Sequence, residues 1–257
     1  MHEGYYINFC FPLLIPNHQN KSAIPCIWHY FPYNKVMKYT TLLIDLDDTL
    51  YPNTNGLWES IRNRMTDFMY QRLNLPLEEV HRLRRYYFEK YGTTLRGLQN
   101  HHQIDADEYL AFVHDLPLEK FLTPDPIIRS LLANLPQQKW IFTNADEAHA
   151  QRVLTILELS DCFNGIIDVR ALNYTCKPQV DAYQQALEIS GERHPSRCVM
   201  FDDSIRNLSP AKNFGITTVL VGKDEPESAV HHTIRSLHEL PEVMPELWET
   251  HFGDSRL

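Results

Sequence analysis

The chain has 257 residues, 43% of them hydrophobic, and a formal net charge of -9 at pH 7. This length suits one large domain or one domain with an insert, and the hydrophobic fraction is enough for a buried core. A chain this acidic is a poor partner for a nucleic-acid polymer, which requires Lys and Arg in excess, but a small anionic substrate can still bind in a locally positive pocket.

The first 36 residues differ in composition from the rest. They are rich in aromatic residues and proline, and they sustain neither the helical nor the strand period. The apolar stretch 7–16 has no Lys or Arg before it, unlike a secretory or transit signal. We expect either that this segment is a poorly ordered extension, or that the given sequence starts upstream of the working initiator, which would be Met37.

Short apolar runs typical of buried strands recur from residue 39 onward. They lie at 39–46, 139–143, 165–169, 197–201 and 217–221, and helical patterns at 147–159, 180–189 and 205–213 separate the last four. This alternation predicts an α/β fold, a doubly wound parallel sheet with helices on both faces. Ligands of such sheets bind beyond the carboxyl ends of the strands.

The region between the first strand and the second has a helical pattern only. Two series of apolar residues recur at helical spacing, namely Leu57, Ile61, Met65, Phe68 and Leu73, then Val80, Leu83, Tyr87 and Tyr91. Gly92 is suited to ending the second helix, and a further helical hairpin is expected to include 109–114. We therefore predict a helical cap at 52–123, a catalytic core at 37–51 and 124–250, and a tail at 251–257.

Residues suited to phosphoryl transfer follow the predicted strands. They are Asp45 and Asp47 after the first strand, Thr143 and Asn144 after the second, Lys177 before the helix at 180–189, and Asp202 and Asp203 after the fourth. Because parallel strands end at one edge of the sheet, we expect these side chains to converge there.

The two aspartates after the first strand can divide the chemistry between them. Asp45 can attack phosphorus and form an aspartyl-phosphate, while Asp47 can protonate the leaving oxygen and later take a proton from water. Crowded carboxylates repel one another, and Mg²⁺, which prefers carboxylate and phosphate oxygens, relieves that repulsion. Asp45 and Asp202 are the natural side-chain ligands, and Asp203 can join directly, join through water or merely cap the next helix.

The remaining site candidates are donors and one supporting residue. Lys177 offers a fixed positive charge for the phosphoryl oxygens, although a surface lysine before a helix is the alternative. The Thr143 hydroxyl and the amide of Asn144 supply further donors. Asn207 either orients an acidic neighbour or lies on a solvated helix face.

These motifs, in this order, resemble the haloacid dehalogenase superfamily. The D-x-D-x-T motif stands at 45–49, followed by Thr143, Lys177 and the acidic pair at 202–203. The resemblance implies a doubly wound core with an inserted helical cap of the first type, between the first two motifs. It also implies Mg²⁺ bound by Asp45, Asp202 and the backbone carbonyl of Asp47.

A narrower resemblance is to the pyrimidine 5'-nucleotidase branch of that superfamily. It rests on residues 91–98, His102, 104–105 and 112–115 in the insert and on 201–207 in the core. It implies UMP or CMP as substrate, although related members dephosphorylate other small metabolites, including pyridoxal phosphate. Thr94 and Arg96, which we place in a loop of the cap, would then close over the substrate; a solvated loop is the alternative.

Other functions remain open. A dehalogenase needs the Asp45 nucleophile but no acid for an alkoxide, a mutase would retain the whole set, and a non-catalytic interaction protein could keep the fold. The odd number of cysteines, five, and the lack of a C-x-x-C pair favour reduced thiols in a cytoplasmic setting. No apolar run approaches the roughly 18 residues expected of a membrane span.

Overall fold

A computed structural model of the chain describes residues 35–52, 54, 56–249 and 251–252. The expectations for 1–34, with Cys10 and Cys26, and for 253–257 therefore lie outside the described residues. Strand β1 (Lys35–Val36) pairs antiparallel with β8 (His251–Phe252). These segments come from the ends of the predicted extension and tail, and they form a small separate sheet.

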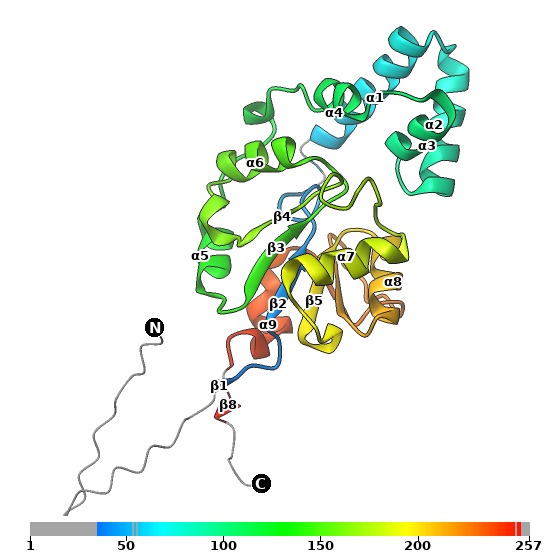
Figure 1. Cartoon of the computed structure of the whole chain (residues 1–257). Helices are drawn as coiled ribbons and strands as arrows, with labels where there is room; N and C mark the ends of the chain where they lie inside the picture. Colours follow the sequence, from blue (N-terminus) through cyan, green and yellow to red (C-terminus); the bar gives the residue numbers. More distant parts are fainter. Residues whose placement is uncertain (1–34, 53, 55, 250, 253–257) are drawn as a thin grey trace, which may run out of the picture. The chain divides into compact units, whose positions relative to one another are not determined.

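Six parallel strands form the central sheet in the order β4-β3-β2-β5-β6-β7 (Figure 1). Their bounds are Thr41–Ile44 for β2, Gln138–Phe142 for β3, Gly165–Ile167 for β4, Cys198–Asp202 for β5, Thr217–Val221 for β6 and His232–Ile234 for β7. The predicted α/β fold is confirmed. The order reverses at β2, so the first strand of this sheet lies at the switch point where such folds bind ligands. Strand β7 was not predicted, because its three residues are too few to show a period.

Alternate strand residues face two separate hydrophobic cores, as a sheet covered on both faces requires. Leu42 and Ile44 pack with α5 (Pro126–Asn134), α6 (Glu147–Ile156) and α9 (Leu240–Val243). On the other face, Leu43 packs with α7 (Val180–Ser190) and α8 (Ile205–Asn213). Figure 1 shows α5 and α6 on one side of the sheet and α7 and α8 on the other.

Helix α5 was also missed, although its start carries two recognisable signals. The carboxylate of Asp125 accepts hydrogen bonds from the backbone amides of Ile127 and Ile128, and Pro126 occupies the first helical position. The helix has nine residues and directly follows the predicted cap, so its sequence pattern was not recognised as a separate helix.

The insert between β2 and β3 is helical and has a core of its own. Its helices are α1 (Leu57–Leu73), α2 (Leu77–Tyr91), α3 (Thr94–His102) and α4 (Ala106–Val113), and they bury Phe68, Tyr87, Leu98 and Tyr109 together.

The loop expected around Thr94 and Arg96 is wrong, because both residues lie in the first turn of α3. The side chain of Thr93 accepts a hydrogen bond from the backbone amide of Arg96 and so caps that helix. Gly92 ends α2, as predicted, whereas Gly97 lies within α3.

Helices α2 and α3 approach each other closely at Gly97. A Cβ atom at this position would lie 2.1 Å from Cγ of Tyr87, which is buried. We expect Gly97→Ala to lower the free energy of unfolding by about 1–3 kcal/mol, because overpacking forces neighbouring atoms to shift. Urea unfolding measures this change. At an unconstrained helix position the same substitution stabilises by roughly 0.5–1 kcal/mol, so a more stable variant would contradict the close approach.

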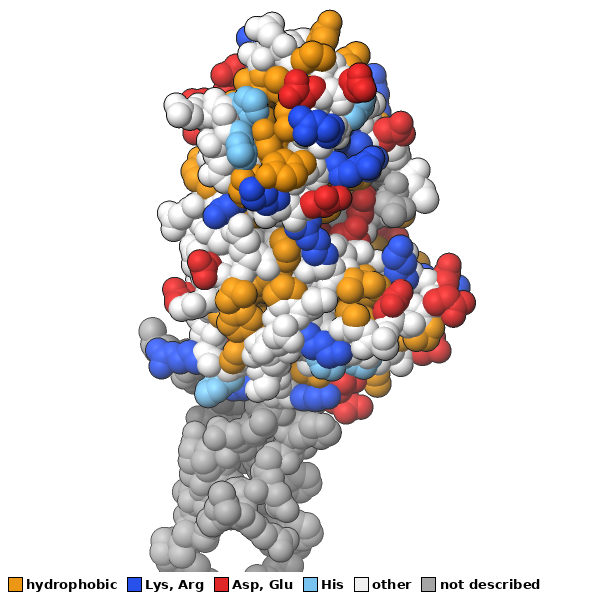
Figure 2. Space-filling model, turned by 90° about the vertical axis from the view of Figure 1, so that its right-hand side faces the viewer, with side chains coloured by type: hydrophobic (Ala, Val, Ile, Leu, Met, Phe, Trp, Pro, Cys, Tyr) orange, Lys and Arg blue, Asp and Glu red, His pale blue; other side chains and the backbone are white. Residues whose placement is uncertain are grey.

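Tyrosine and histidine side chains also join α2 to α3. The hydroxyl of Tyr87 is 2.9 Å from Nε2 of His102, and that of Tyr91 is 2.7 Å from Nε2 of His101. The rings of Tyr87 and His101 stack with centroids 5.2 Å apart. Figure 2 shows hydrophobic and histidine side chains side by side in the upper, cap part of the molecule. His101 and His102 therefore serve to pack α3 against α2.

The described cysteines, Cys162, Cys176 and Cys198, are free and buried. Among the described residues, no helix combines the length and apolar character that crossing a bilayer requires.

Candidate active site

Three of the predicted site residues meet at the carboxyl edge of the sheet. Asp45 directly follows β2, and its backbone amide donates to the carbonyl of Phe201 in β5. Nζ of Lys177 lies 2.7 Å from Oδ1 of Asp45 and 2.7 Å from Oδ2 of Asp202. The nucleophile candidate, the lysine and the late acidic residue therefore form one buried cluster.

Lys177 uses its whole ammonium group inside this cluster. Its third hydrogen bond, also 2.7 Å, goes to the carbonyl of Phe142, and the side chain is 1% exposed. Burial alone would lower the pKa of Lys177, but Asp202 and Asp45 raise it above its usual value. The side chain is thus a permanent buried cation.

Carboxylates outnumber this cation. One oxygen from each of Asp45, Asp202 and Asp203 lies within 4.8 Å of the other two. Burial and the charges of Asp202 and Asp203 raise the pKa of Asp45 well above its usual value, against the opposing effect of Lys177. Burial and Asp202 raise the pKa of Asp203 to about 7. Such a crowded oxygen donor set fits Mg²⁺, since a divalent cation would neutralise the excess negative charge.

Asp48 adds to this negative surplus. Its Oδ1 is buried and has no hydrogen-bond partner within the described part of the chain. Burial and the charge of Asp47 raise the pKa of Asp48 to about 6. An unpaired buried carboxylate oxygen next to the cluster is a second observation that fits a bound cation.

Asp202 is held in place from the start of α8. Nδ2 of Asn207 lies 3.0 Å from its Oδ1 and 3.2 Å from its Oδ2, and the backbone amide of Ser204 donates to Oδ1. Of the two alternatives for Asn207, the structure therefore shows the first: its side chain bonds to an acidic neighbour and does not lie on a solvated helix face. Ser204, and not Asp203, occupies the cap position of α8.

Asn144 uses its side chain to hold the lysine segment. Its Oδ1 accepts from the backbone amide of Lys177 at 2.8 Å, and its Nδ2 donates to the Lys177 carbonyl at 3.0 Å. Thr143 is buried, and its Oγ1 accepts from the amide of Ala145. Across the described residues, the Thr143 hydroxyl hydrogen has no acceptor, so it is available to a ligand.

Asp47 has two partners that the sequence analysis missed. Its Oδ1 lies 2.5 Å from the hydroxyl of Tyr51 and 2.9 Å from Nε2 of His149. Burial alone would raise the pKa of Asp47, but His149 and Tyr51 hold it below its usual value. A signal for His149 did exist: it lies in the first turn of α6, and the helix that follows β3 begins at the edge where Thr143 lies.

The cap meets the core beside Lys177. A Cβ atom at Gly92, where φ is +94°, would lie 2.9 Å from the Lys177 carbonyl. Nη1 of Arg96 donates to the carbonyl of Tyr174. Arg206 of α8 donates to the carbonyls of Phe88 and Glu89, at the end of α2.

The structure does not bring the predicted cap residues to the acidic cluster. Thr94 is buried at the start of α3, and Arg96 is engaged with core backbone. Within the described residues, neither side chain bonds to Asp45, Lys177 or Asp202.

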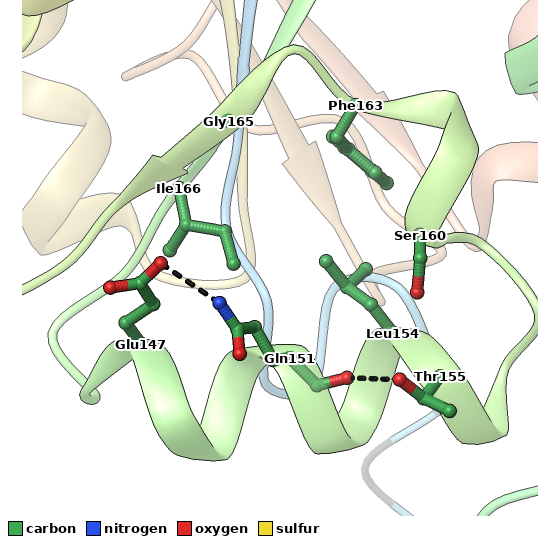
Figure 3. A pocket seen from close by; sticks show the side chains of 8 residues that line it. All are labelled: Glu147, Gln151, Leu154, Thr155, Ser160, Phe163, Gly165 and Ile166. Carbon is green, nitrogen blue, oxygen red and sulfur yellow. Dashed lines mark hydrogen bonds between the residues drawn. The ribbon is translucent and has the colours of Figure 1, made fainter.

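A hollow of about 410 Å³ lies between α6 and the edge strand β4 (Figure 3). Its lining includes Gln151 and Thr155, and both already have partners: Gln151 donates to Glu147, and Thr155 donates to the Gln151 carbonyl. None of the predicted site residues lines it. It is therefore separate from the acidic cluster.

The profile of haloacid dehalogenase-like hydrolases matches residues 39–215. Phosphate metabolism protein 8 of Saccharomyces cerevisiae is 28% identical over 227 residues, covering 78% of this chain and 71% of that protein.

Two solved structures share the architecture. The HAD phosphatase from Thermococcus onnurineus has a TM-score of 0.54 at 20% identity, covering 79% of this chain and 96% of that one. L-2-haloacid dehalogenase from Xanthobacter autotrophicus has a TM-score of 0.52 at 18% identity, covering 80% and 98%. At these identities the likeness shows the fold alone.

Proposed function

Because the chain belongs to the haloacid dehalogenase-like hydrolase family, we propose that it is a Mg²⁺-dependent phosphatase of small phosphomonoesters. The observation that carries this proposal is the contact of Nζ of Lys177 with both Asp45 and Asp202, at 2.7 Å each. A carboxylate nucleophile beside a fixed cation and a surplus of acidic oxygens suits phosphoryl transfer, which depends on positioning and electrostatics.

In this proposal Asp45 attacks phosphorus and Asp47 protonates the departing alkoxide oxygen. Water then attacks the aspartyl-phosphate on Asp45 while Asp47 takes the water proton. In the free protein the lowered pKa of Asp47 favours the carboxylate that this second step needs. A bound phosphate dianion would raise that pKa by charge repulsion and so favour the acid of the first step.

The phosphoryl oxygens would lie near the positive charge of Lys177, whose three hydrogen bonds go to other groups. They would accept hydrogen bonds from the Thr143 hydroxyl and the backbone amide of Asn144. Mg²⁺ would be held by the side chains of Asp45 and Asp202 and the carbonyl of Asp47, with Asp203 joining directly or through water. When bound, it would offset the charge of the phosphoryl group.

Removal of Mg²⁺ is expected to abolish turnover. Dialysis against EDTA should stop phosphate release, because the clustered carboxylates would then repel the substrate dianion, and excess Mg²⁺ should restore it. Ca²⁺ serves as the control cation, since it prefers more ligands at longer distances. Undiminished phosphate release after exhaustive chelation would contradict the metal assignment.

For the substrate we propose a pyrimidine nucleoside 5'-monophosphate, UMP or CMP, in a cytoplasmic setting. The support is the resemblance of the cap segment 91–98 to the nucleotidase branch and the place of Gly92 beside the Lys177 carbonyl. A broader metabolite phosphatase, acting on pyridoxal phosphate or sugar phosphates, is the alternative.

A substrate panel separates these possibilities. Phosphate release is measured with UMP, CMP, AMP, pyridoxal phosphate and sugar phosphates in the presence of Mg²⁺, with Asp45→Asn as the blank. Selective release from UMP and CMP is expected. Even release across the panel would remove the nucleotidase assignment and keep the phosphatase, and release of halide from 2-chloropropionate alone would indicate a dehalogenase. No release from any compound would favour a non-catalytic protein.

A further inference from the structure

Two donors from different parts of the chain converge on one oxygen of Asp47. Tyr51 follows Asp47 by four residues, whereas His149 is 102 residues away, in α6. Both bond to Oδ1. Within the described residues no hydrogen bond reaches Oδ2, and the Asp47 side chain remains 17% exposed. The carboxyl group is therefore tethered by one oxygen and open at the other.

We propose that His149 and Tyr51 are positioning residues that reserve Oδ2 of Asp47 for proton exchange with the substrate. This inference rests on the proposed phosphatase function. A carboxyl oxygen that accepts two hydrogen bonds has no room for a proton of its own, so the acidic proton must sit on Oδ2. The tether also fixes the plane of the carboxyl group relative to β2.

The proton balance is the same in both steps. When Asp45 attacks, the bond from phosphorus to the leaving oxygen breaks, and the proton of Oδ2 passes to that oxygen. When water attacks the aspartyl-phosphate, Oδ2 takes the water proton and the Asp45 carboxylate is released. The hydrogen bonds to Oδ1 persist throughout, so the group need not reorient between the steps.

The ring of His149 is held by stacking, and its backbone is held by Asp146. It stacks on His114 with centroids 4.2 Å apart and planes 20° apart. Asp146 accepts from Nδ1 of His114 at 2.8 Å and from the backbone amide of His149 at 3.3 Å. Arg170 in turn donates to Asp146 at 3.3 Å. A buried side chain with this much support is suited to holding another group in one geometry.

If His149 and Tyr51 position the acid, the effect of replacing them on kcat/KM should depend on the leaving group of the ester. An alkoxide, as released from UMP, needs a well-placed acid, whereas the 4-nitrophenolate of 4-nitrophenyl phosphate leaves without one. We expect Tyr51→Phe and His149→Phe to lower kcat/KM for UMP, or for the best alkyl ester of the panel, by about 10–100-fold, within the range of general acid catalysis. For 4-nitrophenyl phosphate the loss should be less than about threefold, because kcat/KM reports the transfer to Asp45 alone.

Matched variants separate positioning from folding. His149→Gln keeps an amide donor and should recover part of the loss, while His149→Phe keeps a ring to stack on His114. Tyr109→Phe removes a buried hydroxyl without a partner in the described chain, and His231→Phe removes a hydrogen bond to Thr218. Neither control should alter the ratio of the two kcat/KM values.

Asp47→Asn provides the reference pattern, since it removes the acid itself. The inference is supported if the Tyr51 and His149 variants lose kcat/KM for the alkyl ester and not for 4-nitrophenyl phosphate, with melting temperatures near that of the parent. Equal losses for both esters, or no loss with either, overturn it while the phosphatase stands. Failure of the parent protein to hydrolyse any ester would instead refute the proposed function.

Discussion

Asp45→Asn is expected to lower kcat/KM for every phosphomonoester by at least about 10⁴-fold, as loss of a nucleophile does in other covalent enzymes. The amide that replaces the carboxylate cannot form an aspartyl-phosphate. The fold should persist, because Lys177 keeps its hydrogen bonds to Asp202 and to the carbonyl of Phe142. Phosphate release measures the loss, and thermal unfolding verifies the fold.

Asp48→Asn is a useful comparison, because it changes a neighbouring half-buried carboxyl that is proposed neither as nucleophile nor as acid. A similar loss in both variants would point to the summed charge of the cluster and not to a nucleophile. Residual activity of Asp45→Asn near the parent rate would exclude the covalent mechanism on this residue.

Lys177→Met is expected to lose both activity and stability. It leaves Asp45 and Asp202 facing each other without their cation, and removal of one partner of a buried ion pair costs about 3–5 kcal/mol. Because Mg²⁺ would restore positive charge to the same carboxylates, the loss in stability should be smaller with Mg²⁺ than with EDTA. Urea unfolding under both conditions measures the difference.

Lys139→Met is the matched control for a buried lysine. Within the part of the chain that the structure describes, Nζ of Lys139 donates to two backbone carbonyls, those of Leu135 and Gln137, and to no carboxylate. Its replacement should leave turnover unchanged and give the same stability with Mg²⁺ as with EDTA. A Lys177→Met variant with that same indifference to Mg²⁺ would show that Lys177 and the metal do not share ligands.

The strands and the residues at their ends could be predicted because both are local properties. Apolar runs identify buried strands, and parallel topology brings their carboxyl ends to one edge. The pairing of His149 with Asp47 could not be predicted in this way, since it joins residues 102 positions apart and depends on how α6 is rotated about its axis. Similarly, nothing in the sequence indicated that Asn144 would use its side chain on the backbone of Lys177.

In the cap, local signals competed with each other. Gly92 is suited to ending α2, and the residues after it were predicted to form a loop, although the side chain of Thr93 caps α3 there. The small residue at 97 serves a tertiary contact with Tyr87, which a helical period does not reveal. The position of Arg96 on the Tyr174 carbonyl depends on the same packing.

Adjacent residues of α8 serve two different parts of the molecule. Arg206 holds the last carbonyls of α2, and Asn207 holds the carboxylate of Asp202. A shift of this short helix would therefore change contacts at the cap and at the acidic cluster together. Coupling free energies are reciprocal, so if a ligand at Asp202 shifts α8 and loosens or tightens the cap, the cap must change that ligand's affinity by the same factor.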